Sequence, residues 1–165
     1  MKVTRCIEIQ AAADRVWQVL GPNFADADQW CSAVFSSEAR HEGQPLPGAP
    51  AAGRVCETSI GPAKETVTRY DETAHRITYA AHAEKMPGFV RGLVGDWHVE
   101  SLPGEQSRVT FTMTADLKFP FSLVMPPLMK LQLKPLARQT LEELKHFVET
   151  GQPHPRKREA KAAPA

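Results

Sequence analysis

The sequence predicts a single α+β domain in which a curved antiparallel sheet of six or seven strands wraps around one long C-terminal helix. Three features support this prediction. Residues 127–150 carry apolar side chains at helical spacing, and most of the preceding chain alternates apolar and polar residues. Short turns containing glycine and proline separate the alternating stretches. Strands joined by short turns are most simply antiparallel.

The long helix is predicted from Pro127 to Thr150. The apolar residues of this segment recur at steps of three and four, and they are Leu133, Ala137, Leu141, Leu144 and Val148. Proline suits the first helical turn, and Gly151 suits the position that ends a helix with positive φ. The helix therefore has one apolar face, which we expect to lie against the sheet.

The remaining strands and helices are predicted, in chain order, from changes in the spacing of apolar residues. Residues 2–10 alternate as a strand, and two short helices are expected within residues 11–21 and 23–31. The further strands are predicted at residues 33–42, 54–60, 65–70, 75–84, 93–102 and 108–118. A proline- and glycine-rich loop covers 43–53, and a turn built on Gly61-Pro62 covers 59–65.

Composition limits the classes of function. The net charge is +1, but residues 153–165 carry four basic residues against one acidic residue, so the body is slightly acidic. A slightly acidic body argues against nucleic-acid binding. We expect residues 1–152 to form the domain and residues 153–165 to be a disordered basic tail.

The cysteines and the apolar runs indicate the compartment. Cys6, Cys31 and Cys56 are an odd number without a CxxC pair, which favours reduced thiols and a cytoplasmic protein. No apolar run is long enough for a signal peptide or a membrane span. We therefore expect no stable membrane insertion, and the sequence does not predict the oligomeric state.

Four stretches resemble one known superfamily. They are ADRVWQVLGPNFADADQW, GRVCETSIGPAKETVTRYDETAHRITY, DWHVESLPGEQSRVTFTM and LEELKHFVETGQPHP. Their order and spacing over roughly residues 3–153 resemble the START-like superfamily, also called SRPBCC or Bet v-like, and within it the polyketide cyclase/dehydrase group. The resemblance implies the helix-grip fold, with a cavity between the sheet and the long helix. Members bind lipids, polyketides, plant hormones or aromatic compounds, and a minority catalyse cyclisation, dehydration or isomerisation.

Glu65 is the first candidate site residue. It resembles a glutamate that faces the cavity in plant abscisic-acid receptors of this superfamily, and Asp71 matches the aspartate closing the same strand. A carboxylate in an apolar cavity has its charged form disfavoured and its pKa raised, so Glu65 would act as a hydrogen-bonding group or a general acid. The alternative is a strand-start glutamate that faces water.

The segment Ser59, Ile60, Gly61, Pro62 and Ala63 resembles the gate loop of the same receptors, in a shorter form. A lid over a pocket mouth and an ordinary hairpin turn both fit this segment.

The remaining candidates for ligand contact are mostly apolar or aromatic. They are Trp30, Phe35, Val67, Tyr79, His82, Trp97, Phe111, Met113, Met125, Met129 and Leu133. Plain core packing is the alternative for each apolar member. His82 would pair with Glu65 as acid and base, although strand parity places it opposite Tyr79 and favours a surface position. His98 and Glu100 share a strand face, but two ligands are not a metal site.

We therefore expect a binding protein for a small hydrophobic or aromatic molecule, with no metal and no cofactor. A polyketide cyclase or dehydratase using Glu65 as acid/base is the alternative. A third possibility is an interaction protein that docks partners through the outer face of the sheet. The motifs of triad hydrolases, nucleotide sites and dinucleotide sites do not occur.

Overall fold

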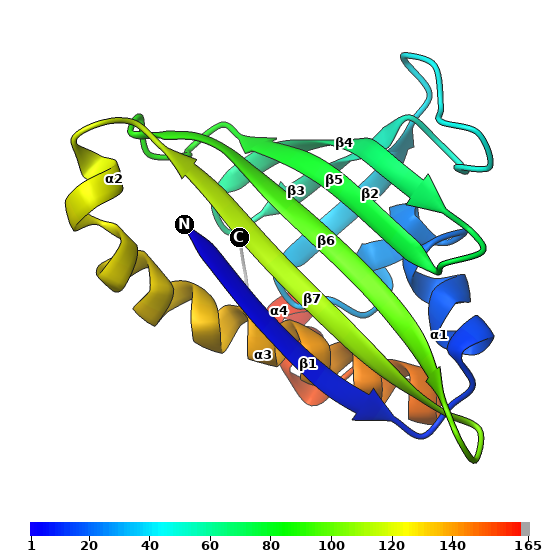
Figure 1. The fold of residues 1–165 in the computed structure, drawn as a ribbon. Helices are drawn as coiled ribbons and strands as arrows, with labels where there is room; N and C mark the ends of the chain where they lie inside the picture. The colour runs from blue at the N-terminus through cyan, green and yellow to red at the C-terminus, as the bar shows by residue number, and fades with distance from the viewer. Residues whose placement is uncertain (163–165) are drawn as a thin grey trace.

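The computed structural model describes residues 1–162 and shows a seven-stranded antiparallel sheet that curves around a long helix (Figure 1). The strands are β1 (Lys2–Ile9), β2 (Val34–Arg40), β3 (Gly53–Thr58), β4 (Gly61–Asp71), β5 (Arg76–Ala83), β6 (Val90–Leu102) and β7 (Gln106–Leu117). Their order across the sheet is β1-β7-β6-β5-β4-β3-β2. Strands β2 to β7 thus form a meander, and β1 closes onto β7. The predicted fold class is confirmed.

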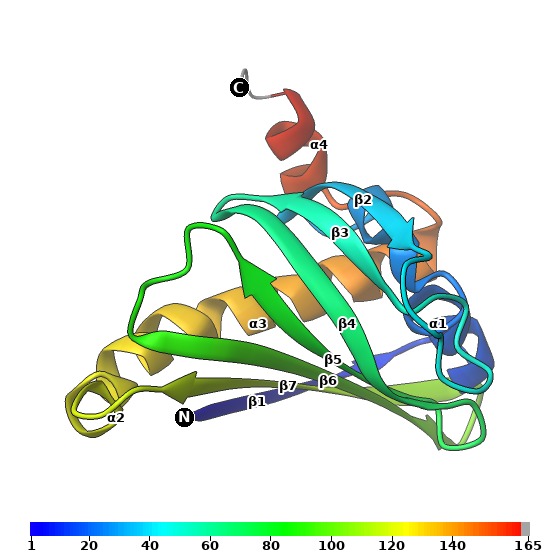
Figure 2. The same cartoon turned by 90° about the horizontal axis from the view of Figure 1, so that it is seen from above.

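The helices lie on the concave side of the sheet and at its ends. Helix α1 (Ala13–Leu20) and the 3₁₀ helix η1 (Phe24–Gln29) connect β1 to β2, as predicted. A short helix α2 (Phe121–Val124), which the sequence analysis did not predict, precedes the long helix α3 (Pro126–Thr150). Seen from above, α3 crosses the concave side of the sheet (Figure 2).

The core lies between α3, α1 and the sheet. The predicted apolar stripe of α3 is buried from Ala137 through Leu141 and Leu144 to Val148, while Leu133 is only partly buried. Gly151 ends the helix with φ 71°, and its N–H donates to the carbonyl of Phe147 at 2.8 Å. The helical period in the sequence therefore located the main packing face correctly.

The connection between β3 and β4 is shorter than predicted. Only Ser59 and Ile60 form the turn, and Gly61, Pro62 and Ala63 belong to β4, paired with residues of β3. The hydroxyl of Thr58 donates to the carbonyl of Gly61 at 2.8 Å, and Gly61 has φ 82°. Glycine accepts this positive φ, and proline is tolerated near the first residue of a strand. The local structure is therefore a hairpin with the two-residue loop Ser59-Ile60.

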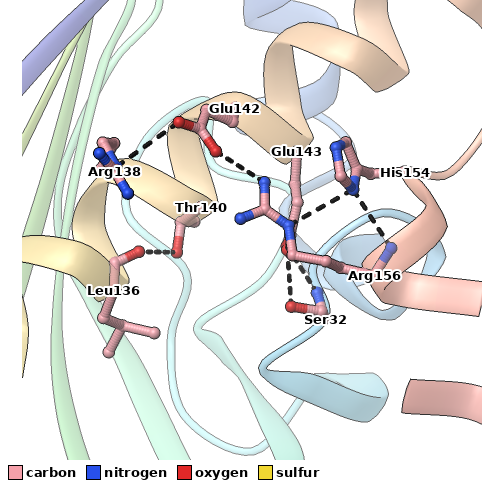
Figure 3. A network of polar contacts seen from close by, with 8 residues as sticks. All are labelled: Ser32, Leu136, Arg138, Thr140, Glu142, Glu143, His154 and Arg156. Atoms are coloured by element: carbon pink, nitrogen blue, oxygen red, sulfur yellow. Dashed lines mark hydrogen bonds and ion pairs between the residues drawn. The ribbon is translucent and has the colours of Figure 1, made fainter. Parts of the chain in front are cut away.

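The C-terminal segment corrects a second prediction. Residues of the predicted disordered tail form helix α4 (Pro155–Ala162), which packs on the body; residues 163–165 lie outside the described part of the chain. The guanidinium of Arg156 donates to Glu142 at 2.7 Å and approaches Glu143 at 3.4 Å (Figure 3). The ammonium of Lys157 is buried and donates to the carbonyl of Val34 at 2.6 Å. These long-range contacts leave no trace in local composition, which is why the sequence suggested disorder.

Glu143 links the body to this C-terminal helix. Its side chain is 1% exposed, and it accepts hydrogen bonds from the backbone N–H and hydroxyl of Ser32 at 2.8 and 2.7 Å. Arg156 Nε approaches the same carboxylate at 3.4 Å, as Figure 3 shows. The segment between η1 and β2 is therefore fixed to α3 and to α4 together.

None of the helices within residues 1–162 has the length and apolar character needed to cross a membrane.

Candidate functional site

A cavity of about 300 Å³ lies between the concave face of the sheet, η1 and helix α3. Its wall is mainly apolar. The predicted candidates that line it are Trp30, Glu65, Tyr79, Trp97, Phe111, Met113 and Leu133, together with Ser59, Ile60 and Ala63 of the β3–β4 segment. Further lining residues that were not predicted include Phe24, Ala27, Cys31, Val34, Arg54, Ala81 and Ala83. The volume falls at the lower end of the range usual for small-molecule sites.

Stacked aromatic rings form one wall of the cavity. The rings of Trp97 and Phe111 lie nearly parallel, 3.8 Å between centroids and 11° between planes, on the paired strands β6 and β7. Trp30 approaches Trp97 edge-on at 6.3 Å from the end of η1. Because these rings are held by a strand pair and by each other, this wall is preformed.

A buried ion pair provides the main polar group of the cavity wall. Arg54 Nε donates to Glu65 Oε2 at 2.6 Å, and the two residues face each other across β3 and β4. A second donor of Arg54 reaches the carbonyl of Phe24 at 2.6 Å, and the guanidinium lies 4.1 Å from the centre of the Phe24 ring. Burial alone would lower the pKa of Arg54, but the Glu65 carboxylate, with smaller contributions from Tyr79 and Cys56, raises that pKa overall.

The ion pair changes the interpretation of Glu65. The sequence predicts a lone carboxylate in apolar surroundings, whereas in the structure Glu65 has Arg54 as an ion-pair partner at 2.6 Å. Glu65 does line the cavity, with a side chain 12% exposed. As a general acid it would first have to release Arg54 from this contact.

Tyr79 brings a hydroxyl to the same region. Burial raises the pKa of Tyr79, and the negative charge of Glu65 raises it further, while Arg54 and a hydrogen bond from the Trp97 indole oppose the shift. The Tyr79 ring lies directly over Gly95 of the neighbouring strand β6, where a Cβ atom would come within 2.4 Å of the ring. Tyr79 is therefore a neutral hydrogen-bonding group held against the sheet.

Two predicted cavity residues, Phe35 and His82, are placed away from the cavity by strand geometry. Phe35 is 51% exposed because the β2–β3 register shifts between Val34 and Ser36, so that Val34 lines the cavity instead. His82 is exposed on the outer face opposite Lys64, and Ala81 is the residue paired with Glu65. The acid/base pair of Glu65 and His82 therefore does not form.

Three further candidates pack elsewhere, and of these only Val67 is fully buried. Val67 belongs to the main core but does not line the cavity. Met125 and Met129 pack on a separate small cluster of Val90, Ala115 and Leu117. Helix α2 and the start of α3 cover this end of β6 and β7, which directs both methionines away from the cavity.

Sequence reasoning missed Arg54 and Cys31. A two-residue turn at Ser59-Ile60 places Arg54 directly opposite Glu65, so the correct hairpin register would have identified the pair. Burial, with the nearby charge of Glu143, raises the pKa of the Cys31 thiol to about 11. Such a thiol is a poor nucleophile and acts as an apolar part of the wall.

The role of Ser59 to Ala63 as a gate stays a prediction. Ser59, Ile60 and Ala63 line the cavity, and Ile60 is 44% exposed at the turn. Within residues 1–162, no group of three or more His, Cys, Asp or Glu side chains is arranged to hold a metal.

Solved structures share this fold at low sequence identity. A di-domain ARO/CYC protein, BexL from the BE-7585A biosynthetic pathway, matches with a TM-score of 0.71 and 17% identity over 90% of this chain and 46% of that chain. Ara h 8.0201 matches with a TM-score of 0.69 and 12% identity over 90% of this chain and 97% of that chain. A START superfamily protein from Mycobacterium smegmatis gives a TM-score of 0.62 and 16% identity over 90% and 94%. At these identities the likeness establishes the fold alone.

No curated protein matches the sequence. The family model described as "Polyketide cyclase / dehydrase and lipid transport" matches residues 1–149, which include all seven strands and nearly all of α3. The chain therefore belongs to the polyketide cyclase/dehydrase and lipid transport family.

Proposed function

We propose that the protein binds a small hydrophobic or aromatic molecule in the cavity between the sheet and α3. The observation that carries the proposal is a volume of about 300 Å³ whose wall is mainly apolar side chains. Apolar surface that is not packed against protein favours an apolar guest, because transfer of such a guest from water is favourable. Family membership supports the same conclusion, since the family description includes lipid transport.

The polar part of the wall indicates the chemistry of the ligand. Arg54, Glu65 and Tyr79 lie together on β3, β4 and β5, whereas Trp97, Phe111 and Met113 form an apolar wall on β6 and β7. A guest with an apolar or aromatic body and one hydroxyl or carbonyl group fits this division. The polar group would hydrogen-bond at the ion pair, and the body would lie on the stacked rings.

The test is a titration with N-phenyl-1-naphthylamine, a neutral apolar dye whose fluorescence rises in apolar surroundings. We expect saturable one-to-one binding that is weakened by Leu133→Phe, which places a larger side chain at the cavity wall. Gln132→Phe is the matched control, because Gln132 is exposed on the same helix and does not line the cavity. Equal dye affinity for both variants and the unmodified protein would place any binding outside the cavity.

The natural guest is sought by native mass spectrometry of protein purified from its own cells. We expect a bound mass that is displaced by the dye. Recovery of unliganded protein that also fails to take up the dye would contradict the proposal.

A catalytic role is the second candidate, favoured by the position of Glu65 in the cavity wall. In a cyclase or dehydratase the carboxylate would transfer a proton at the substrate. Once a ligand is identified, comparison of turnover with binding for Glu65→Gln separates the two functions. Loss of turnover with binding retained supports catalysis, and unchanged turnover removes Glu65 from the mechanism.

A further inference from the structure

An exposed apolar surface covers helix α2 and the first turns of α3, and we name it the α2–α3 surface. Its members are Phe119, Leu123, Val124, Leu128 and Leu131, whose exposed fractions run from 51% to 78%. They lie at one end of the molecule, where α2 follows the end of β7 (Figure 1). Single exposed apolar residues are ordinary, but a concentration of this kind marks an interaction site.

The segment is held in place on its inner side. The ring of Phe121 stacks on Phe89 at 5.0 Å, and Met125 and Met129 pack on the small cluster under β6 and β7. The carbonyl of Met125 accepts the N–H of Met129 at 3.0 Å, which continues the helical bonding into α3. The exposed side chains are therefore presented outward by an anchored element.

The segment from the end of β7 to the middle of α3 carries charge of one sign. Residues 117–141 contain Lys118, Lys130, Lys134 and Arg138 and no aspartate or glutamate. Arg138 approaches Glu142 at 3.6 Å, whereas none of the three lysines makes an ion pair within residues 1–162. All three lysines are exposed. The surface therefore combines protruding apolar side chains with unneutralised positive charge.

Helical spacing places these two features side by side on α3. Leu128 and Leu131 are three residues apart, and Lys134 is three residues beyond Leu131 and four beyond Lys130. The cavity-lining Leu133 and Leu136 lie on a different side of the helix. One solvent-facing strip of α3 thus carries both the leucines and the lysines.

We propose that the α2–α3 surface docks on an anionic lipid membrane. The apolar side chains enter the boundary between headgroups and acyl chains, and the lysines pair with anionic headgroups at the same level. Lysine suits this position because its apolar stem follows the side chains inward while the ammonium stays with the headgroups. The protein lies on the membrane and does not cross it.

A second copy of the chain fits the surface less well than lipid. A symmetric dimer through this surface would place the same lysines of both copies against each other without acidic partners. An anionic membrane supplies the missing negative charge and accepts the apolar side chains together. The charge pattern therefore favours lipid over self-association.

The surface lies at the same end of the molecule as part of the cavity wall. The β3–β4 turn, the β5–β6 connection and α2 lie at this end (Figure 2). Ile60 of the turn and Met86 of the connection line the cavity. Docking would hold this end of the cavity next to lipid. The docking proposal itself depends only on the α2–α3 surface and does not rest on the proposed function.

The test is co-sedimentation of the full chain with vesicles of phosphatidylcholine alone or mixed with phosphatidylglycerol. We expect binding to the mixed vesicles that weakens as salt is added, with much less binding to phosphatidylcholine. The double variant Leu123→Ser/Leu131→Ser should weaken binding to mixed vesicles by about tenfold or more. The double variant Lys130→Glu/Lys134→Glu should do the same, by at least about tenfold.

Matched controls come from the other parts of the sheet. Phe35→Ser replaces an exposed aromatic residue on β2, and Lys64→Glu reverses an exposed lysine on β4. Both should leave vesicle binding unchanged. Failure of the unmodified protein to bind mixed vesicles would overturn the proposal, as would equal loss in control and surface variants.

Sedimentation equilibrium tests whether a second copy of the chain, rather than lipid, covers the α2–α3 surface. A monomer before and after the surface substitutions agrees with lipid docking. A dimer that Leu123→Ser/Leu131→Ser converts to monomer would assign the surface to a second copy and overturn the proposal. The dye titration of the cavity is run on the same variants, and unchanged dye affinity shows that the surface and the cavity are separate functions.

Discussion

The ion pair of Arg54 and Glu65 is both a structural tie and a polar group in the cavity wall. Arg54 connects β4 through Glu65 to η1 through the Phe24 carbonyl, and it also lies over the Phe24 ring. Both side chains are almost entirely shielded from water, at 8% and 12% exposed. A buried pair of this kind contributes little net stability, but removal of one partner leaves a charge without compensation.

Replacement of one partner therefore has a predictable cost. Glu65→Gln should lower the free energy of unfolding by about 3–5 kcal/mol, because Arg54 stays buried without its carboxylate. The double variant Arg54→Met/Glu65→Leu should recover most of that loss, since it removes both charges and keeps apolar volume. Urea denaturation of the three proteins measures the difference. Equal losses in the single and double variants would show that the charge imbalance is not the cause.

Gly95 is required by the position of Tyr79. A Cβ at Gly95 would lie 2.4 Å from the phenol ring, so Gly95→Ala must displace the ring that lines the cavity. We expect a loss of about 1–3 kcal/mol in stability, as for other overpacked sites, and an altered dye affinity. Gly92→Ala on the same strand is the control, because a Cβ there meets nothing within 4 Å. Thermal unfolding and the dye titration measure both effects, and equal behaviour of the two variants would contradict the assignment.

At the scale of elements, helix α4 is fixed by its own first residues. The Nδ1 atom of His154 accepts the backbone N–H of Arg156 at 3.2 Å, and the His154 carbonyl accepts the N–H of Lys157 at 2.9 Å. His154 therefore occupies the capping position of α4, and its side chain must be unprotonated at Nδ1 to accept the hydrogen bond. The capping of α4 then depends on the charge of one imidazole.

The stability that His154 contributes should fall in mild acid. Partial burial lowers the pKa of His154 below its ordinary value, and the charges of Arg156 and His146 lower it further. The unfolded chain thus takes up a proton more readily than the folded protein. This contribution is complete above the unfolded pKa of about 6.5 and is lost as the pH falls through the folded value.

Asparagine at this position separates capping from titration. The amide oxygen of Asn accepts the same N–H at a helix start but does not titrate in this range. Between pH 7 and pH 5, His154→Asn should lose less stability in urea denaturation than the unmodified protein. Parallel pH profiles for the two proteins would exclude His154 as the source.

The sequence predicted elements well where local period determined them. The alternation of β7 and the apolar stripe of α3 could be predicted, because within one regular element the direction of a side chain follows from its position in the repeat. The error at Phe35 arose where a single residue shifts the phase, at the register shift between Val34 and Ser36. Because side-chain direction alternates with every residue, one shift moves a predicted contact to the other face.

At the scale of the whole molecule, the site depended on contacts that no local pattern records. The contact of Arg54 with Glu65 follows only from the hairpin register, and Lys157 bonds to Val34, which lies 123 residues earlier in the chain. The cavity itself is a difference between the space enclosed by the fold and the volume of the side chains that point into it. Sequence patterns predicted which residues point inward, but not how completely they fill that space.

The presence of unfilled space in the cavity can be tested by a substitution on the sheet that fills part of it. Ala81 lines the cavity on β5, and Ala80 beside it does not. Ala81→Leu adds three carbon atoms to a void, so it should raise the unfolding free energy by about 1–2 kcal/mol at roughly 0.8 kcal/mol per buried methylene, less the cost of fixing the side chain. The same change should lower dye affinity, because the dye and the new side chain compete for one space.

Opposite changes in stability and affinity distinguish an open cavity from a packed core. In a packed core the larger side chain would be overpacked, and Ala81→Leu would lose about 1–3 kcal/mol. Ala80→Leu makes the same substitution one residue away and should change dye affinity little, because strand alternation directs it to the other face of the sheet. Differential scanning calorimetry without ligand gives the stability, and the dye titration gives the affinity. A more stable Ala81→Leu protein that binds the dye weakly would identify the void between β5 and α3 as the space the guest occupies.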